Sequence, residues 1–562
     1  MHDVTRHTSR LSALLALLGA GGMAHAATLT VNTTGTGGAY TSIQTAVNAA
    51  STGDTISVAA GTYSEAIDFA GKAITVQSTA GYASTIIDAT GSGSTYAVTF
   101  DDYEGAGSVL NGFTVRNTGG QGIFIEYSEP TLANLYMSGL GTASATGGAI
   151  QISAGSPSIS NSTFVTNTAL YGGHIFMDDL SSPTITGSTF TGGSASSGGA
   201  LYMDDSNVAT VDECTFDANV SSSTGGAIFL GDFVELTMTD STVSSNTSGS
   251  NGGGLYAMTY QDLTMDGVDF TDNIANSGSS SGGGMFVNNY STVSIANGSY
   301  TGNEGATGGG LFVSNAEFSL DTVTFDANEA TGSAGGAYLS TNSTDSAITD
   351  SVFTDNVAAS WGGNAYFNGS SSTRYGVTVS GSTLTGGTAQ GGGGIYAQYV
   401  DLELALTEVS NNTATSSSAR SSSSYPSQLP GNGGALSAYR ATITLDGATL
   451  DGNTANGNGG AIYLRKDTTS TSAALESSLV LDGATISNNT ATFNGGGVAL
   501  YQTYDVHNWA DALLSGNTAS ENGGGVWMDD RVDLITDHDG AGLIVCGKGK
   551  LNKEKTKNKS EC

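Results

Sequence analysis

The sequence is poor in cysteine and proline, and these two shortages exclude several kinds of architecture. Only Cys214, Cys546 and Cys562 occur in 562 residues, so no disulfide framework can hold a chain of this length. Five prolines, without a three-residue glycine period, exclude a collagen-type chain. We therefore expect Cys214 to be a small buried residue, and the stability to come from packing alone.

Basic side chains are also scarce. Lys and Arg together number 16 against 50 acidic residues, which gives a formal net charge of −34. Six of the lysines lie between Lys548 and Lys559, so the rest of the chain is more acidic still. A body this negative repels nucleic acid and polyanionic sugars. The composition predicts no nucleic-acid partner and no required cofactor, and it favours calcium or cationic partners.

Long apolar runs are missing beyond the first residues. Arg6 and Arg10 precede the apolar run Leu11 to Leu18, and Ala24-His25-Ala26 follows it. This order is typical of a secretory signal peptide, which we place at residues 1–26. No later stretch reaches the roughly 20 apolar residues of a membrane-spanning helix. We expect an exported protein, at the cell surface or outer membrane or extracellular, without a transmembrane helix.

Glycine is abundant and recurs in a fixed pattern. The 82 glycines are about twice the ordinary share. Many belong to a motif of two glycines, a small residue, an aliphatic residue and an aromatic, as in Gly198-Gly199-Ala200-Leu201-Tyr202. Copies follow one another at spacings of 25 to 41 residues, mostly close to 27. A period in this range indicates a solenoid rather than a set of unlike domains.

A second motif, an aromatic followed three positions later by asparagine, marks most of the repeats. We interpret it as a strand that ends in a tight corner, where asparagine tolerates the left-handed conformation and can form a hydrogen-bonded ladder between repeats. Copies are Phe164 to Asn167, Phe216 to Asn219, Phe270 to Asn273, Tyr300 to Asn303, Phe325 to Asn328 and Phe353 to Asn356.

Units of about 27 residues with short strands and sharp corners predict an all-β fold, a parallel β-helix. About 18 coils stacked at the inter-strand spacing would form a rod on the order of 85 Å long. Leucine-rich repeats would need a helical half, and propeller blades would need about 40 residues each. The segment Ser42 to Ala50 has apolar residues on one helical face, and we expect it to form a short N-terminal capping helix.

The organisation follows from the repeat. We expect an N-terminal cap and irregular coils over residues 27–146, and regular coils over 147–530. A Ser/Pro-rich loop interrupts them at 413–432, and a second insertion falls around Lys466 to Glu476. The irregular, lysine-rich segment 531–562 has no apolar periodicity, and we expect it to be disordered.

The paired motifs, Gly-Gly-Ala-Ile/Leu and Phe-x-x-Asn, resemble the repeats of the chlamydial polymorphic outer membrane proteins over roughly residues 147–527. The stretch from Ile43 to Glu65 is similar to the start of right-handed β-helices of the pectin-lyase type. These resemblances imply a right-handed β-helix displayed at the surface as an adhesive passenger. Members of the first family end in a membrane β-barrel, whereas this chain ends in lysines, so the resemblance leaves the anchoring route open.

Two aspartate pairs are candidate calcium ligands. Asp178 and Asp179 follow one copy of the glycine motif, and Asp204 and Asp205 occupy the same place in the next. Stacking would bring like charges within about 5 Å, where a cation relieves their repulsion. The alternatives are a solvated acidic corner or a catalytic carboxylate pair of the glycosidase kind. Asp529-Asp530 repeats the pattern far away, and Asp537-His538-Asp539-Gly540 is only part of a calcium loop.

The aromatics of the glycine motif are candidate ligand-binding residues. If the neighbouring aliphatics point inward, strand alternation turns the rings outward, where they could contact sugars or another protein. The alternative is a stack that only stabilises neighbouring coils. The predicted stripe contains Phe176, Tyr202, Phe229, Tyr256, Phe286, Phe312 and Tyr396, and the column extends to Tyr366, Tyr463 and Trp527.

The sequence thus favours an exported, non-catalytic adhesion protein that binds a polysaccharide or a host or neighbouring surface protein. The second hypothesis is a polysaccharide-degrading enzyme, a lyase or glycoside hydrolase, of the same fold. A structural envelope layer is the third. An enzyme should show one coil where the repeat breaks and polar groups converge, whereas an adhesin should show a long uniform face.

Overall fold

The computed structural model describes residues 26–370, 372–416, 432–465, 477–501, 506–528, 533–536 and 544–545. Nearly all of the predicted signal peptide, most of the 413–432 loop and the insertion at 466–476 lie outside these residues. The same holds for Asp529, Asp530 and most of the segment 531–562.

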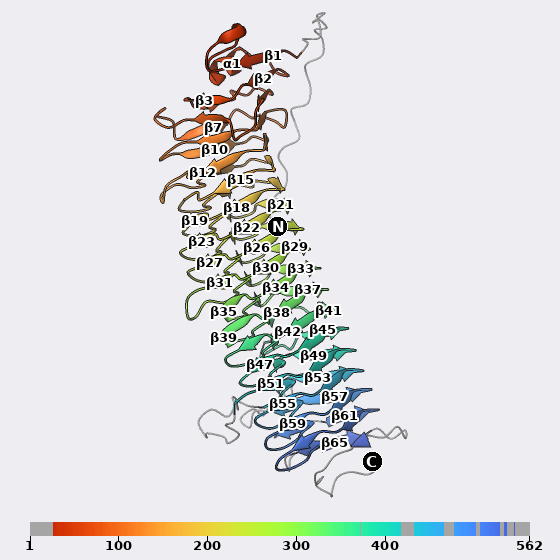
Figure 1. Ribbon diagram of the computed structural model, residues 1–562. Helices are drawn as coiled ribbons and strands as arrows, with labels where there is room; N and C mark the ends of the chain where they lie inside the picture. The colour runs from red at the N-terminus through yellow and green to blue at the C-terminus, as the bar shows by residue number, and fades with distance from the viewer. Residues whose placement is uncertain are drawn as a thin grey trace, which may run out of the picture.

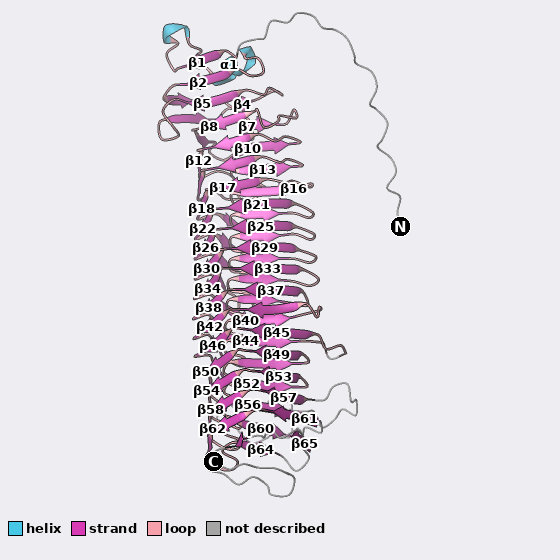
Figure 2. Cartoon of the chain, turned by 90° about the vertical axis from the view of Figure 1, so that its right-hand side faces the viewer, coloured by secondary structure: helices cyan, strands magenta, loops and turns pink. Residues whose placement is uncertain are grey.

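The chain folds into an all-β, right-handed parallel solenoid of about 17 turns with about 27 residues per turn, as predicted. The turns stack into one long rod, from β1 (Thr28–Val31) at one end to β66 (Ile544–Val545) near the other (Figures 1 and 2). Every pairing between described strands is parallel, and each coil pairs with the coil before and after it.

One coil shows the plan of all the regular ones. β21 (Val208–Asp212), β22 (Thr215–Asp217), β23 (Val220–Ser221) and β24 (Ile228–Leu230) follow one another around the rod. They belong to four different sheets, called here A, B, the short-strand sheet and C. Within the described ranges, sheet A has 19 strands and the short-strand sheet has 12.

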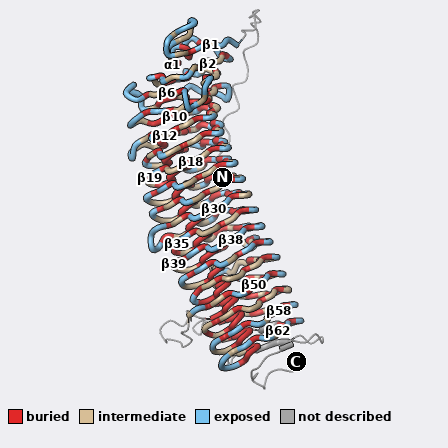
Figure 3. The backbone as a smooth tube through the Cα atoms, in the orientation of Figure 1, coloured by how far each residue is buried: buried red, intermediate tan, exposed pale blue. Residues whose placement is uncertain are grey.

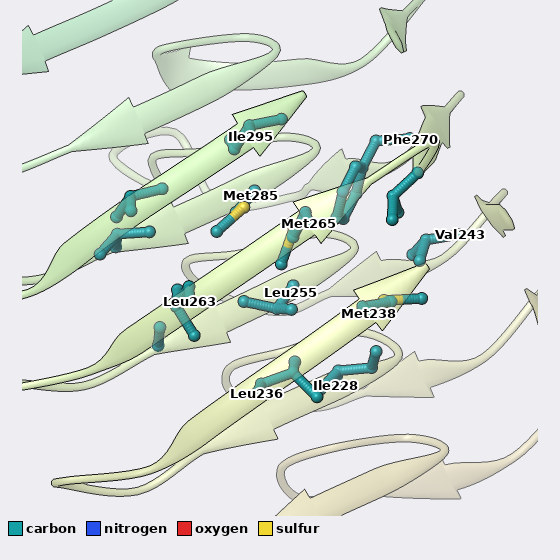
Figure 4. Packing of buried hydrophobic residues seen from close by; sticks show 14 of the residues in the cluster. Ile228, Leu236, Met238, Val243, Leu255, Leu263, Met265, Phe270, Met285 and Ile295 are labelled. Carbon is teal, nitrogen blue, oxygen red and sulfur yellow. The ribbon is translucent and has the colours of Figure 1, made fainter. Parts of the chain in front are cut away.

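The inward side chains form one continuous apolar core along the rod. In β20 (Leu201–Met203), Leu201 and Met203 are fully buried and belong to this core, whereas Tyr202 between them does not. Figure 4 shows residues of sheets A, B and C meeting inside three coils, and Figure 3 shows exposed residues where the coils turn. Cys214 is buried in this core, as predicted, and burial raises the pKa of its thiol to about 11.

A short helix covers the first coil, as predicted. α1 (Ile43–Ala49) buries Ile43, Ala46 and Val47 against the core, and Ser42 Oγ accepts the Thr45 N–H at 3.1 Å as its N-cap. Glu65 holds this helix end from the next coil, because its carboxylate accepts the Ile43 and Gln44 N–H groups at 2.7 and 3.0 Å. In the described part of the chain, no helix is long and apolar enough to cross a bilayer.

The asparagines of the second motif form the predicted ladder. Asn246 is fully buried, and its backbone N–H and side-chain Nδ2 both donate to Asn273 Oδ1, at 3.0 and 2.9 Å. Asn273 donates in the same way to Asn303, and Asn303 to Asn328. Each Nδ2 also donates to the carbonyl of an aromatic or aliphatic residue in the preceding coil, such as Val243 for Asn273. Every polar atom of these buried amides is thereby satisfied.

The prediction that these asparagines adopt the left-handed conformation is wrong, because the preceding residue adopts it instead. The residue before each asparagine has the positive φ, for example Ser245 at 55° before Asn246 and Asp272 at 54° before Asn273. The corner therefore turns just outside the core, and this turn directs the following asparagine inward. Inside, the amide has partners on both neighbouring coils, which a solvent-exposed corner residue would lack.

Among the described regular coils, from residue 147 on, two lack the asparagine, and each gap is filled from the glycine motif of the preceding coil. Gly387 stands at one ladder position, and Asn364 bridges it by accepting from Asn356 Nδ2 at 3.0 Å and donating to Asn412 Oδ1 at 2.9 Å. Gly193 stands at the other, and His174 Nδ1 lies 2.9 Å from Asn167 Nδ2. A Cβ at Gly193 would lie only 2.7 Å from His174 Nε2, so the glycine makes room for the ring.

The ladder predicts a large loss of stability when one member is removed. Asn273→Ala leaves the backbone and side-chain donors of Asn246 without their acceptor inside the core and removes one of the two donors to Asn303 Oδ1. This change should lower the free energy of unfolding by about 2–3 kcal/mol. The measurement is the urea midpoint followed by circular dichroism. Asn276→Ala, at an exposed position three residues away, is the matched control and should change nothing. Equal midpoints for both variants would show that the ladder adds no stability.

His174 gives the ladder a pH dependence. Burial lowers the pKa of this imidazole to about 3, while Asn219 and the Thr191 backbone act in the opposite direction. The unfolded chain therefore binds a proton that the folded chain does not, so stability is lost as pH falls from about 6.5 towards 3. Between about pH 7.5 and about pH 5, the wild type should lose about 2 kcal/mol more than His174→Asn, which fills the same place without titrating. Parallel losses in the two proteins would contradict the assignment.

Candidate functional site

The aromatics of the glycine motif stand in one column on the outer side of sheet C. From Phe176 to Tyr396, each ring pairs in register with the ring of the next coil, as Tyr202 does with Phe229 and Phe229 with Tyr256. Their ring centroids lie 4.5 and 5.5 Å apart with nearly parallel planes. Strand alternation produces this column, because the residues on either side of each ring point into the core.

The column is partly covered, although it lies outside the core. Phe176, Phe229, Phe286 and Tyr396 are 6–7% exposed and none of them belongs to the apolar core, whereas Tyr202, Tyr256 and Phe312 are half-buried. Tyr171 packs against Tyr202 from the neighbouring loop, with ring centroids 4.9 Å apart. The stack accounts for much of the ring area, so the column acts at least as a stabilising contact between coils. Ligand binding by the predicted stripe stays a prediction.

A more exposed set of apolar side chains lies at the adjacent corner, where each strand of sheet C turns into sheet A. Phe233, Tyr260 and Tyr290 follow β24, β28 (Leu255–Ala257) and β32 (Met285–Val287) and are 58%, 49% and 56% exposed. Their rings stack at 4.9 and 5.3 Å with interplanar angles of 1° and 15°. The same corner carries exposed apolar side chains in earlier coils: Tyr103, Tyr127 and Leu180. We call these six residues the corner ridge.

All six ridge residues have a left-handed backbone, with φ between 49° and 62°. A bulky side chain in this conformation costs about 1–2 kcal/mol, and glycine or asparagine would avoid the cost. Bulky side chains on exposed, strained corners lower the stability of the fold. Their presence there is therefore better explained by contact with a partner than by stability. The sequence holds a signal for the central three, since each stands four residues after a column aromatic: Phe229, Tyr256 and Phe286.

The predicted aspartates lie beside the ridge and the column. Burial raises the pKa of Asp178, and the Asp179 and Asp204 carboxylates raise it further, while Ser153 opposes the shift. Burial also raises the pKa of Asp204, helped by Asp205 and Asp179 and opposed by the Asp205 N–H. These mutual effects agree with the expected proximity of the two pairs. Among described residues, the three carboxyls within 4.8 Å of one another are those of Asp68, Asp101 and Asp102, not the predicted four.

Part of this acidic corner has a structural role. Asp205 Oδ1 accepts the Asp232 N–H at 2.8 Å, and Asp232 Oδ1 accepts the Thr259 N–H at 2.9 Å. Each aspartate therefore orders the turn of the next coil. Asp179 accepts the Ser153 hydroxyl at 3.2 Å, whereas Asp178 Oδ1 is buried without a hydrogen-bond partner. His174 lies in the core ladder and away from this corner.

Comparison with known proteins agrees with this architecture. The family described as the right handed beta helix region matches residues 103–270, and the Chlamydia polymorphic membrane protein repeat matches residues 447–465. These matches cover 168 and 19 of the 562 residues, so they show a similarity over these segments. The polymorphic membrane protein repeat match contains β54 (Thr449–Asp451), β55 (Thr454–Ala455) and β56 (Ile462–Arg465). These strands pair in register with the next coil, so the matched segment lies within the solenoid.

More distant comparisons add little to this assignment. No curated protein matches the chain significantly. Among solved structures, the chain is similar to the A-module of the Azotobacter vinelandii mannuronan C-5 epimerase AlgE6, with 12% identity over 88% of this chain and 93% of that one. The TM-score is 0.21, so this similarity carries no argument about activity.

Calcium binding at Asp178, Asp179, Asp204 and Asp205 predicts a thermal shift. Added calcium should raise the melting temperature of the wild type because it relieves repulsion between neighbouring carboxylates. The double variant Asp178→Asn/Asp204→Asn removes that repulsion, at about 0.2–1 kcal/mol per like-charge pair, and should melt higher without calcium and not respond to it. Asp68→Asn controls for the separate exposed cluster. A calcium response that is the same in all three proteins would place the ion elsewhere.

Proposed function

We propose that this protein is an exported surface or extracellular β-helix protein with a non-catalytic adhesion role, and that it binds its partner through the corner ridge. The observation that supports this proposal is the stacked and exposed trio Phe233, Tyr260 and Tyr290 on left-handed corners. The polymorphic-membrane-protein repeat supports the surface location.

The physical properties of the ridge fit a flat partner of low charge. Aromatic faces pack against sugar rings or apolar protein side chains, and three rings at a constant spacing offer a rigid platform without loss of side-chain freedom. The surrounding corner is acidic, with Asp205, Asp232 and Asp262 close by in sequence. A polysaccharide without dense negative charge, or a host or neighbouring surface protein with cationic groups, is therefore the partner class.

The second candidate function is cleavage of a polysaccharide, and one observation favours it. Asp178 and Asp204 have raised pKa values and lie beside the outward aromatics, which is the environment of a carboxyl that donates a proton. Incubation with a panel of polysaccharides, followed by assay of new reducing or unsaturated ends, separates the two functions. Turnover lost in Asp178→Asn would establish the enzyme and overturn the adhesion proposal.

The adhesion proposal predicts a specific separation of binding from stability. Tyr260→Asn keeps the left-handed corner but removes the central ring, so binding to an immobilised panel of polysaccharides and surface proteins should fall about threefold to tenfold. Stability should stay level or rise, because asparagine relieves about 1 kcal/mol of backbone strain that offsets the lost stacking.

The control is Tyr82→Asn, which removes another exposed ring that stacks on Tyr136 at a different corner. Binding should be unchanged in this variant. Equal losses in both variants, or a loss of stability that accompanies any loss of binding in Tyr260→Asn, would contradict a ridge-specific contact.

A further inference from the structure

The aromatic column has two breaks among the later coils, at Ser437 and at Ala499, and the first points to a different kind of site. Tyr396 and Tyr463 belong to coils on either side of β52 (Leu436–Tyr439), where the column position is Ser437. A missing ring between two rings leaves a space two inter-strand spacings high, about 10 Å. A cavity of about 10 Å³ remains there, and Trp361, Tyr439 and Arg465 are among the residues that line it.

The cavity has aromatic walls and a guanidinium group. Trp361 packs on Tyr396 with ring centroids 5.2 Å apart. Tyr396, Tyr439, Tyr463 and Ser437 are all buried, so the cavity is narrow, and its lining is as polar as it is apolar. About one water molecule or one ligand oxygen fits in a space of this size.

Arg465 is the unusual component. It is only 5% exposed, and its Nε and Nη1 have no hydrogen-bond partner. The two ion pairs among the described residues are Arg116 with Asp88 and Arg374 with Asp401, so no described carboxylate pairs with Arg465. Its guanidinium lies 5.8 Å from the centroid of the Tyr501 ring, a contact that compensates little of the cost of burying a charge.

A buried guanidinium whose donors lack partners is stabilised when an anion binds to it. It is a rare positive group in a chain of net charge −34, so we expect it to bind an anion. A carboxylate is favoured over a phosphate or sulfate for two reasons. It is planar, so one of its oxygens can enter the narrow space and accept from the guanidinium donors while the rest of the group stays outside. The negative field of the rod also disfavours ligands with more than one charge.

We infer that the gap at Ser437 is a binding site for a single carboxylate group, which pairs with Arg465 and is carried by a small, otherwise uncharged molecule. The rest of such a ligand lies against Trp361 and Tyr396 at the rim. This site is separate from the corner ridge, so its failure would leave the adhesion proposal standing.

Titration of the full chain with propionate and benzoate, followed by the fluorescence of Trp361 and by calorimetry, tests the inference. Saturable binding is expected for both acids, and none for the neutral isosteres propionamide and benzamide. Inorganic sulfate should bind more weakly than either acid. Preference for sulfate, or equal binding of acids and amides, would overturn the carboxylate assignment.

Two variants remove the site in different ways. Arg465→Met keeps the aliphatic stem and removes the unpaired charge, so the fold should be kept while the affinity for propionate falls by about tenfold or more. Ser437→Phe restores the missing ring, fills the cavity and should abolish binding with Arg465 still present. Arg440→Met is the matched control, because Arg440 stacks over Tyr399 and Tyr439 but does not line the cavity.

Each outcome decides the matter. Loss of binding in Arg465→Met and Ser437→Phe, with unchanged binding in Arg440→Met, supports the site. Binding that survives either of the first two variants, or is absent in the wild type at the highest soluble acid concentration, refutes it. The melting temperature of each variant distinguishes loss of the site from loss of the fold.

Discussion

Parallel stacking in exact register is the constraint on which the rest of this structure depends. Each coil donates its backbone N–H groups to the carbonyls of a neighbouring coil, as Ile274 does to Asn246 at 2.9 Å. A residue that suits one coil therefore meets its counterpart in the next at the same place and at the same spacing. Asparagine amides exploit this arrangement inside the rod and aromatic rings exploit it outside, since both interact favourably with copies of themselves.

Because of this constraint, inward-facing residues determine the fold, and outward-facing residues are available for function. Residues that face inward must match their neighbours, and where the match fails the fold compensates, as Asn364 and His174 do beside Gly387 and Gly193. Outward residues are free of that demand. Departures from the repeat on the outer surface, such as rings on strained corners or Ser437 in a column of aromatics, are therefore the places where function can be sought.

The fold could be predicted from the sequence because one repeat determines the next. The period, the parallel strands, the inward aliphatics and the capping helix all follow from spacing and alternation. The corner ridge was harder to predict, because Phe233, Tyr260 and Tyr290 lie outside the repeated motif. The site at Arg465 could not be predicted, because it needs residues from several coils, with Trp361 about a hundred positions before Arg465. The role of His174 could not be predicted either. It depends on the missing side chain at Gly193 in the next coil, and no sequence motif links these two residues.

Hydrogen exchange of the native chain is the most direct test of whether the asparagine ladder locks the coils together. The amides of Asn246, Asn273 and Asn303 each donate to a buried side chain of the next coil. They should exchange among the slowest in the protein, and at similar rates from coil to coil. Exchange as fast as that of the exposed loop 277–279 would show that the coils open independently of the ladder, and would contradict its role.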